Sequence, residues 1–463
     1  FALLNFIKQT QMEKQNWLCL LSAHLLILQS AIASSFSVHH FCHHDEGLAL
    51  LQFKEQFKIS ASNEFSSYCS YFGQHPHPKI TSWNESTDCC TWDGVTCHEI
   101  TGHIIQLDLS CSQIEGVISP NSSLFGLSQL QKLNLAYNDF QQSRILREFS
   151  GLTQLTHLNL STSNFKGQIA SEISQLSKLV LVDFSLHPPS STTLRLQKHD
   201  FQMLLRNLTK ISVLCLSSVH IASEVPLNFS SSLTYLDLSS TGMHGNLPDH
   251  VFEIPNMQAL VLGSNENLTG ILPKFNSSIS SLEVLDLSFT NLFGELPVSI
   301  GSLKSLNSLI LFGCQFSGSL PESIGNLSKL TDLILGSNKF VGQIPRSISN
   351  FVSLKTLDLS GNGFQGPIPD SFNNLQKLTS LSLSYNSLVG PLPPSVVNLT
   401  ALVDVDIRFT LLSGPLPANA SGLQELISLQ ITHNLLNGTL PPWLFHLPAV
   451  IFLDLAFNHF TGQ

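Results

Sequence analysis

The feature that most constrains the fold of this chain is a sequence pattern that returns from residue 104 to the end. Three clear copies are LTDLILGSNKFVGQIP at 330–345, LKTLDLSGNGFQGPIP at 354–369 and LTSLSLSYNSLVGPLP at 378–393. From Leu285 onward, the second apolar position of the pattern returns every 24 residues. A fixed period of this length is typical of proteins built by stacking one small structural unit on the next.

The two leucines of each LxL segment lie two residues apart, so they point to the same side of an extended strand. A single copy cannot bury them, and stacking many copies provides a continuous core. The Gly and Ile/Leu-Pro that end the copy favour extended backbone, and segments such as ESIGNLSKL can then form one helical turn. The pattern therefore predicts an α/β leucine-rich-repeat solenoid at 104–463, with about 15 repeats and parallel strands on the concave face.

A polar residue follows the strand of most repeats and can hydrogen-bond backbone groups of neighbouring repeats. It is asparagine at Asn138, Asn265, Asn338, Asn362, Asn386, Asn434 and Asn458. Other repeats place Ser163, Thr241, Thr290, Cys314 or Thr410 there, and Cys314 is expected to be buried. Val219 has no donor group, so this ladder should be weaker at that repeat.

One interval, from Val182 to Leu214, is longer than the others. Its surplus residues LHPPSSTTLRLQKHD, at 186–200, predict a protruding loop. The loop could contact a ligand, but we favour a tolerated insertion.

The N-terminal segment has the three parts of a secretory signal peptide. A lysine-bearing start after Met12 precedes an apolar run at 17–28 and the small-residue exit Ala31-Ile32-Ala33. The apolar run is too short to span a bilayer, which needs about 20 residues. We therefore assign 1–33 to residues upstream of a start at Met12 and a signal peptide, 34–103 to a cysteine-rich capping domain, and 104–463 to repeats truncated at the C-terminus.

An extracellular location also predicts N-glycosylation. The Asn-x-Ser/Thr motifs after the signal peptide are at Asn84, Asn121, Asn159, Asn207, Asn228, Asn267, Asn276, Asn326, Asn398, Asn419 and Asn437. Asn159 lies on a predicted concave strand, where a glycan would exclude a ligand from the early repeats.

The cysteines gather before and at the start of the repeats, in an arrangement that predicts disulfides. Cys89 and Cys90 are neighbours whose Cα atoms, about 3.8 Å apart, are too close for an unstrained disulfide. Cys90 with Cys97 encloses a short turn, which leaves Cys89 for Cys42 in front of the helix-compatible segment DEGLALLQFKEQFK. The remaining pair is Cys69 with Cys111. This helix would cover the exposed end of the solenoid.

Other classes of site are poorly supported. With 22 basic against 32 acidic residues, the chain has no basic bias toward nucleic acid. His39, His40, His43 and His44 flank Cys42, and His75 and His77 follow, but no spacing matches a structural zinc site, so we expect no metal and no cofactor. No phosphate loop, nucleophile elbow or HExxH helix is present, so we do not expect an enzyme. We interpret Asp108, Asp237, Asp286 and Asp358 as solvated strand positions.

A ligand would sit on the concave strand positions, which extend over roughly 70 Å at about 4.8 Å per strand. Most of these positions hold small residues, so the larger ones stand out as anchors. The candidates are Phe289, Ile310, Phe312, Ile334, Tyr385, Asp404, Asp406, Arg408 and Phe409. The alternative is that the aromatic residues pack along the edge of the solenoid.

The segment STDCCTWDGVTC, followed by TGHIIQLDLSCSQIEG and the GxIP repeats, resembles plant leucine-rich-repeat receptor-like proteins. The likeness is greatest to the tomato-type disease-resistance receptor-like proteins. It implies the plant-specific repeat type, a disulfide-bonded helical cap and the pairs Cys42–Cys89 and Cys90–Cys97. It also implies the secretory pathway, with extracellular repeats at the plasma membrane on a C-terminal helix that this fragment lacks.

The resemblance implies a cell-surface immune receptor that binds a pathogen-derived protein or peptide and signals through adaptor and co-receptor receptor kinases. Two alternatives stay open. The chain could be the ectodomain of a receptor kinase for peptide or hormone signals, which a downstream kinase would reveal. It could also be a secreted inhibitor of microbial wall-degrading enzymes, which an intact C-terminal cap would identify.

Overall fold

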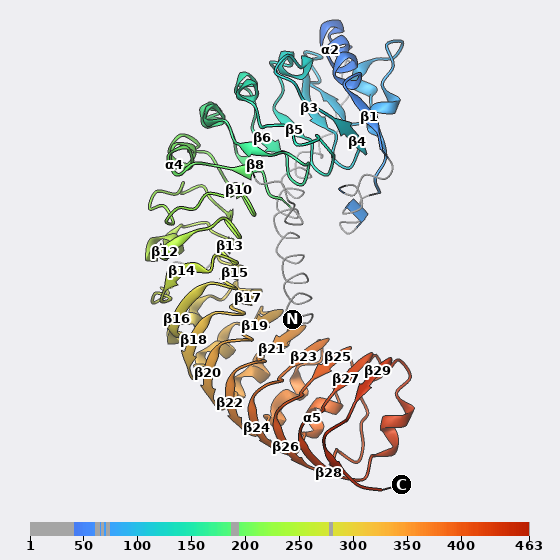
Figure 1. Ribbon diagram of the computed structural model, residues 1–463, viewed down its shortest axis with the longest axis vertical. Coiled ribbons are helices and arrows are strands. Elements are labelled where there is room, and N and C mark those ends of the chain that lie inside the picture. The colour runs from blue at the N-terminus through green and yellow to red at the C-terminus, as the bar shows by residue number, and fades with distance from the viewer. Residues whose placement is uncertain are drawn as a thin grey trace. The chain divides into compact units, whose positions relative to one another are not determined.

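The computed structural model describes residues 41–462 apart from 61–64, 66–68, 71–74, 187–193 and 277–280. It divides into two compact units, one ending at Met243 and one beginning at His244 (Figure 1). Each unit is described by itself. The predicted signal peptide at 1–33 lies outside the described residues.

The first unit begins with the cap, whose helix α2 (His44–Lys54) buries Leu50 and Phe53. Strand β1 (Phe57–Ile59) pairs antiparallel with β4 (Ile114–Gly116), and β2 (Val95–Cys97) pairs antiparallel with β3 (Ile104–Asp108). The short 3₁₀ helices η1 (Lys79–Ser82) and η2 (Cys89–Thr91) connect them. α2 lies against η3 (Ser123–Gly126) of the first repeat, where the Ser123 hydroxyl donates to the Ala49 carbonyl at 2.6 Å, so the helix covers the end of the solenoid as predicted.

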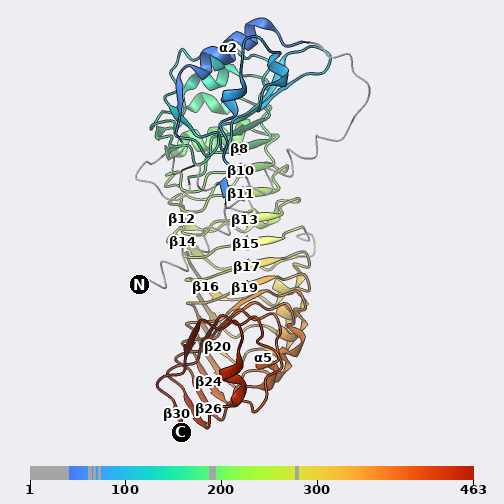
Figure 2. The same cartoon turned by 90° about the vertical axis from the view of Figure 1, so that its right-hand side faces the viewer.

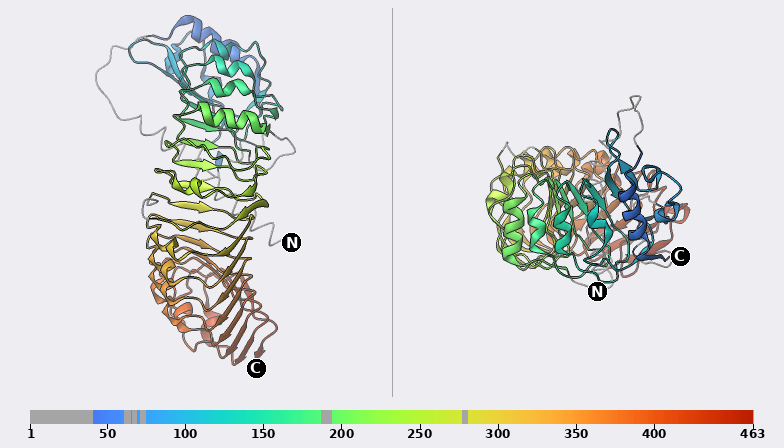
Figure 3. Two further views of the ribbon diagram at one scale, coloured as in Figure 1. Left: turned by 90° about the vertical axis from the view of Figure 1, so that its left-hand side faces the viewer. Right: turned by 90° about the horizontal axis from the view of Figure 1, so that it is seen from above.

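Parallel strands follow in the first unit, each donated by one repeat. They are β3, β5 (Lys132–Asn134), β6 (His157–Asn159), β8 (Leu181–Asp183), β10 (Val213–Cys215) and β11 (Tyr235–Asp237). Leucines at equal repeat positions pair, such as Leu107 with Leu133 and Leu133 with Leu158, and all are buried. Short helices form the flank (Figure 3), namely η3 (Ser123–Gly126), η4 (Arg147–Gly151), η5 (Ser171–Gln175) and α4 (Lys198–Asn207).

The predicted loop at 186–200 is partly wrong. Residues 187–193 lie outside the described residues, but Leu194–Arg195 form strand β9, which pairs in parallel with β7 (Gly167–Gln168). Helix α4 begins at Lys198 and buries Phe201, Leu204 and Leu205. The last residues of the insertion therefore form the first turn of a helix whose apolar face is buried. The Pro/Ser/Thr-rich composition of the insertion gave no sign of this helix.

The second unit contains one series of parallel strands that carries the predicted concave positions, which we call the inner sheet (Figure 2). Its members are β13 (Ala259–Val261), β15 (Val284–Asp286), β17 (Ser308–Ile310), β19 (Asp332–Ile334), β21 (Thr356–Asp358), β23 (Ser380–Ser382), β25 (Asp404–Asp406), β27 (Ser428–Gln430) and β29 (Phe452–Asp454). They pair in a register that repeats at every step, for example Leu333 with Leu357 and Leu357 with Leu381. The regular 24-residue spacing predicts this register.

A second, ten-stranded parallel sheet forms from the residues after the ladder position, where the sequence predicted only extended backbone. Its strands are β12 (His244–Asn246), β14 (Asn267–Gly270), β16 (Asn291–Glu295), β18 (Gln315–Gly318), β20 (Lys339–Gly342), β22 (Gly363–Gly366), β24 (Ser387–Gly390), β26 (Leu411–Gly414), β28 (Leu435–Gly438) and β30 (His459–Phe460). Phe316, Phe340 and Phe364 stack behind it with ring centroids 6.3 and 6.2 Å apart. The second sheet therefore encloses the core between two series of strands.

Short helices complete the repeats of the second unit. They are η6 (Asp249–Glu253), η7 (Val298–Ser302), η8 (Glu322–Asn326), η9 (Arg346–Asn350), η10 (Asp370–Asn374), α5 (Pro394–Val397) and η11 (Pro442–His446). η8 is the helical turn that the segment ESIGNLSKL predicts.

The asparagine ladder has the hydrogen bonds that the sequence predicts. The Nδ2 atom of Asn362 donates to the carbonyl oxygens of Leu335, Leu359 and Ser360 at 3.0–3.1 Å. Its Oδ1 atom accepts from the Phe340 amide at 3.0 Å. Cys314 takes the place of the ladder asparagine in its repeat. It is buried, and its Sγ atom donates to the Leu287 carbonyl at 3.1 Å.

The prediction that the aspartates of the LDLS segments are solvated is wrong for Asp237 and Asp286, which are fully buried. Each of the four aspartates, Asp108, Asp237, Asp286 and Asp358, accepts a hydrogen bond at 2.8–2.9 Å from the backbone amide of the serine two residues later. A side chain that bonds its own backbone two residues on forms a turn of Asx type. These aspartates therefore end the strand.

Candidate recognition surface

Three of the predicted apolar anchors are buried and do not form an exposed surface, and the candidate Asp406 is also buried. Ile310 and Ile334 pair in register on β17 and β19 and are 3 and 4% exposed. Phe312 is 2% exposed because its ring lies over Gly336, where an added Cβ would come within 2.8 Å of the ring. Phe289 is half-buried and its ring tilts against Phe312, with centroids 5.3 Å apart. For this pair, the alternative of edge packing holds.

The other two aromatic candidates belong to a continuous column of rings in the second unit. Tyr385 stacks on Phe409 with centroids 4.6 Å apart, Phe409 on His433 at 4.1 Å, and His433 on Phe457 at 4.2 Å. We call these four residues the aromatic stack. The planes of successive rings differ by 13, 19 and 29°.

The aromatic stack arises from one repeat position, directly before the ladder residue. All four residues have a left-handed backbone, with φ between 51 and 55°. This conformation is costly for non-glycine residues, and the ladder helps to fix it in each repeat. The amides of Tyr385, Phe409 and His433 each donate to a carbonyl oxygen of the next repeat, at 2.9–3.1 Å. The stack is therefore held on regular secondary structure.

Tyr385, the first ring of the stack, is more exposed than Phe409, which has a ring on each side. Tyr385 is 51% exposed, whereas Phe409 is 38% exposed. The faces of the inner rings are covered by their neighbours, so the inner rings present mainly their edges. Exposed aromatic groups on a rigid support are typical anchors of protein recognition.

Two charged candidates, Asp404 and Asp406, lie on β25, and Arg408 follows this strand directly before Phe409 of the stack. Arg408 forms a two-pronged ion pair with Asp406, with both N–O distances at 3.0 Å. Burial alone would lower the pKa of Arg408, but the hydrogen bonds and charge of Asp406 raise it. Burial raises the pKa of Asp404, a hydrogen bond from Ser428 opposes this, and the charge of Asp406 adds to it. The structure thus brings Tyr385, Phe409 and this charged group together.

His433 and Phe457 were missed by the sequence analysis. His433 lies 24 residues after Phe409, and Phe457 lies 24 residues after His433, so aligning the repeats on Phe409 would have found both.

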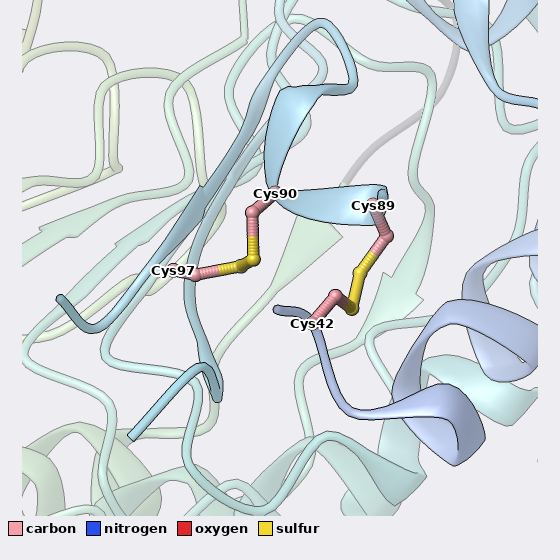
Figure 4. Close-up of side chains that lie close together, drawn as sticks. All are labelled: Cys42, Cys89, Cys90 and Cys97. Carbon is pink, nitrogen blue, oxygen red and sulfur yellow. A yellow bond between two sulfur atoms is a disulfide. The ribbon is translucent and has the colours of Figure 1, made fainter. Parts of the chain in front are cut away.

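The cap cysteines form three disulfides, Cys42–Cys89, Cys90–Cys97 and Cys69–Cys111. Figure 4 shows the neighbouring Cys89 and Cys90 turning to different partners. Sulfur atoms of Cys42, Cys89, Cys90 and Cys97 lie within 4.8 Å of one another, but as disulfides they present no thiolate to a metal. His43 stacks on His103, with centroids 3.8 Å apart. His39 and His40 lie outside the described residues.

The glycosylation motifs differ in exposure. Asn159 lies on β6 as predicted, but it is only 7% exposed and its Oδ1 accepts from the Ser161 amide at 3.0 Å, so the structure does not present it as an acceptor. Asn207 and Asn398 are half-buried. The exposed sites are Asn84, Asn121, Asn228, Asn267, Asn276, Asn326, Asn419 and Asn437.

Comparison with protein families identifies both parts of this architecture. The family "Leucine rich repeat N-terminal domain" matches residues 43–98, and "Leucine-rich repeat region" matches residues 278–461. Among solved structures, a TDR receptor is 27% identical, with a TM-score of 0.64 over 81% of this chain and 67% of that one. The plant peptide hormone receptor RGFR1, in complex with RGF2, shares the fold at 24% identity, with a TM-score of 0.62 over 80% of this chain and 72% of that one. The chain is a leucine-rich-repeat protein.

Curated relatives narrow this class. "Receptor-like protein Cf-9" of Solanum pimpinellifolium is 43% identical over 54% of this chain and 29% of its own length. "Receptor-like protein 6" of Arabidopsis thaliana is 41% identical over 58% of this chain and 28% of its own length. The chain therefore belongs with the plant leucine-rich-repeat receptor-like proteins, and its matched part spans less than a third of each relative. Within the described ranges, no helix is both long and apolar enough to span a membrane.

Proposed function

We propose that this chain is the extracellular ligand-recognition region of a plant cell-surface immune receptor. In this proposal it binds a pathogen-derived protein or peptide and signals through adaptor and co-receptor receptor kinases in the plasma membrane. The disulfide-bonded cap and the exposed glycosylation motifs suit an extracellular chain. The relationship to receptor-like proteins of two plant species supports the receptor class.

The observation that carries the proposal is the aromatic stack beside Asp404, Asp406 and Arg408. Aromatic and arginine side chains are enriched among the residues that dominate protein binding. Here they lie on adjacent repeats whose strands fix their positions, so little conformational entropy is lost on binding. This part of the second unit is the best-supported contact surface for a ligand.

A leaf assay tests the proposal. The complete coding sequence, including any part after residue 463, would be expressed in a leaf that lacks the gene and then challenged with extracts of fungal, oomycete and bacterial pathogens. We expect cell death or an oxidative burst with at least one extract, together with co-precipitation of a leucine-rich-repeat receptor kinase. If no extract gives a response although the receptor reaches the cell surface, the proposed function is wrong.

A matched pair of variants locates the contact. Replacing Tyr385, Phe409 and Phe457 together by serine should abolish the response. Phe293 is 49% exposed but lies on β16, away from the stack, so Phe293→Ser should leave the response intact. Equal loss in both variants would place recognition elsewhere or indicate misfolding, which cell-surface abundance distinguishes.

A further inference from the structure

The aromatic stack ends at Tyr385 because the equivalent position of the preceding repeat is Gly361, which has no side chain. Gly361 has the left-handed backbone of the stack position, with φ of 60°. The three atoms nearest to a Cβ added there would all belong to Ser337, at 3.4 Å. The ring face of Tyr385 that looks toward this repeat is therefore not covered by a neighbouring ring, in accord with its 51% exposure.

The absence of a side chain at Gly361 leaves a step that is one strand spacing deep, about 4.8 Å. Successive rings of the stack fill the same spacing, with centroids 4.1–4.6 Å apart. The step beside Tyr385 thus has room for a planar group, and Ser337, at the equivalent position one repeat earlier, places no ring on its far side. A ligand group that is flat on both sides would extend the stack by one member.

The repeats on either side of Tyr385 each carry an acidic residue on the inner sheet. Asp358 lies three residues before Gly361 in the same repeat, and Asp404 lies on β25. Neither forms an ion pair with a basic side chain among the described residues, whereas Asp406 is paired with Arg408. Burial raises the pKa of Asp358, and the charge of Asp406 adds to this effect. A cationic partner would relieve the cost of both carboxylates.

We propose that the step at Gly361 binds an arginine side chain of a basic peptide segment, with the guanidinium stacked on Tyr385 and its charge balanced by Asp358. A guanidinium is planar, carries a positive charge, stacks on aromatic faces and pairs with carboxylates, so it meets both requirements. A lysine ammonium meets only the charge requirement. This inference rests on the proposed function and names the chemistry of the ligand.

Three labelled decapeptides test the inference on the purified secreted chain. One alternates arginine with serine, one lysine with serine, and one glutamate with serine. Binding is measured by fluorescence anisotropy at about 0.15 M salt, where long-range attraction to an acidic surface is largely screened. We expect the arginine peptide to bind more tightly than the lysine peptide, and the glutamate peptide not to bind.

Gly361→Tyr is the decisive variant because it fills the step with the protein's own ring. Its backbone is compatible, since Tyr385 has φ of 54° at the equivalent position. Stacking and cation–π attraction of about 1–2 kcal/mol correspond to a rise in Kd of roughly five- to thirtyfold. Tyr385→Ala should weaken binding similarly. Phe293→Ala removes an exposed ring on β16, outside the stack, and should change Kd by less than about twofold.

Thermal melts show which variants are folded, so that only those are compared. If folded Gly361→Tyr binds the arginine peptide as tightly as the parent chain, or if the lysine peptide binds equally well, the inference is wrong. Failure of the inference can be told apart from failure of the proposed function. If the full-length receptor responds to a pathogen extract but Gly361→Tyr does not reduce that response, the inference is wrong and the proposed function stands.

Discussion

Replacing Asn386 by alanine tests how strongly the ladder supports the aromatic stack. Asn386 is buried and directly follows Tyr385. Its Nδ2 atom donates to the carbonyl oxygens of Leu359 and Leu383 at 3.0 Å and of Ser384 at 3.2 Å. Its Oδ1 atom accepts from the Phe364 amide at 3.0 Å.

The expected loss of stability follows from the groups left without this side chain. The Leu359 carbonyl keeps a hydrogen bond from Asn362, whereas the Leu383 carbonyl and the Phe364 amide both lose a bond in a buried place. Each buried group left unsatisfied costs about 1–3 kcal/mol. With two such groups, we expect Asn386→Ala to lower the free energy of unfolding by roughly 2–6 kcal/mol.

Urea unfolding followed by circular dichroism measures this loss. Asn373→Ala, at an exposed asparagine on η10, is the matched control and should stay within about 0.5 kcal/mol of the parent chain. Asn386→Thr should lose less than Asn386→Ala, because Thr410 donates to a carbonyl at the equivalent position of the next repeat. If Asn386→Ala were as stable as the Asn373→Ala control, the ladder would not support the repeats as argued.

Three further predictions concern ionisable groups. Burial raises the pKa of the Cys314 thiol to about 11, so iodoacetamide at pH 8 should modify it in urea but not in the native chain; rapid native modification, read by mass spectrometry, would contradict this. The raised pKa of Asp358 means that its contribution to stability is present below the ordinary value of 3.8 and is lost as the pH rises through the folded-state pKa. Asp358→Asn should therefore raise the melting temperature more at pH 7 than at about pH 3.5, and an equal change at both would refute the assignment. Arg408→Met leaves the carboxylate of Asp406 partly buried without its partner and should cost about 1–3 kcal/mol at neutral pH, whereas adding Asp406→Asn should restore part of that loss in urea unfolding.

The repeat architecture was predictable because its cause is local and periodic. The LxL leucines and the asparagine after them recur at fixed spacing, so strand, core and ladder follow from one repeat. The cap disulfides required one more step, the exclusion of a bond between Cys89 and Cys90. The second sheet was not predicted, because its strands are short and pair only with equivalent segments of neighbouring repeats.

The recognition surface was harder to predict because exposure depends on neighbouring repeats. Phe312 and Tyr385 are both aromatic residues near a strand end, yet Gly336 lets the first ring fold down while Phe409 holds the second one upright. The buried role of Asp286 was missed for a related reason. Its carboxylate is satisfied by its own backbone, and alternation along a strand gives no sign of this.

Site-specific photo-crosslinking in the secreted chain tests the central claim most directly. The photoreactive residue p-benzoylphenylalanine would replace Tyr385 in one sample and Phe293 in another, and both would be irradiated in leaf apoplastic fluid from infected and healthy plants. We expect a covalent adduct with a pathogen-derived protein or peptide at position 385, from infected plants only, and none at position 293. Equal adducts at both positions, or a pathogen-derived adduct at position 293 alone, would contradict recognition at the aromatic stack.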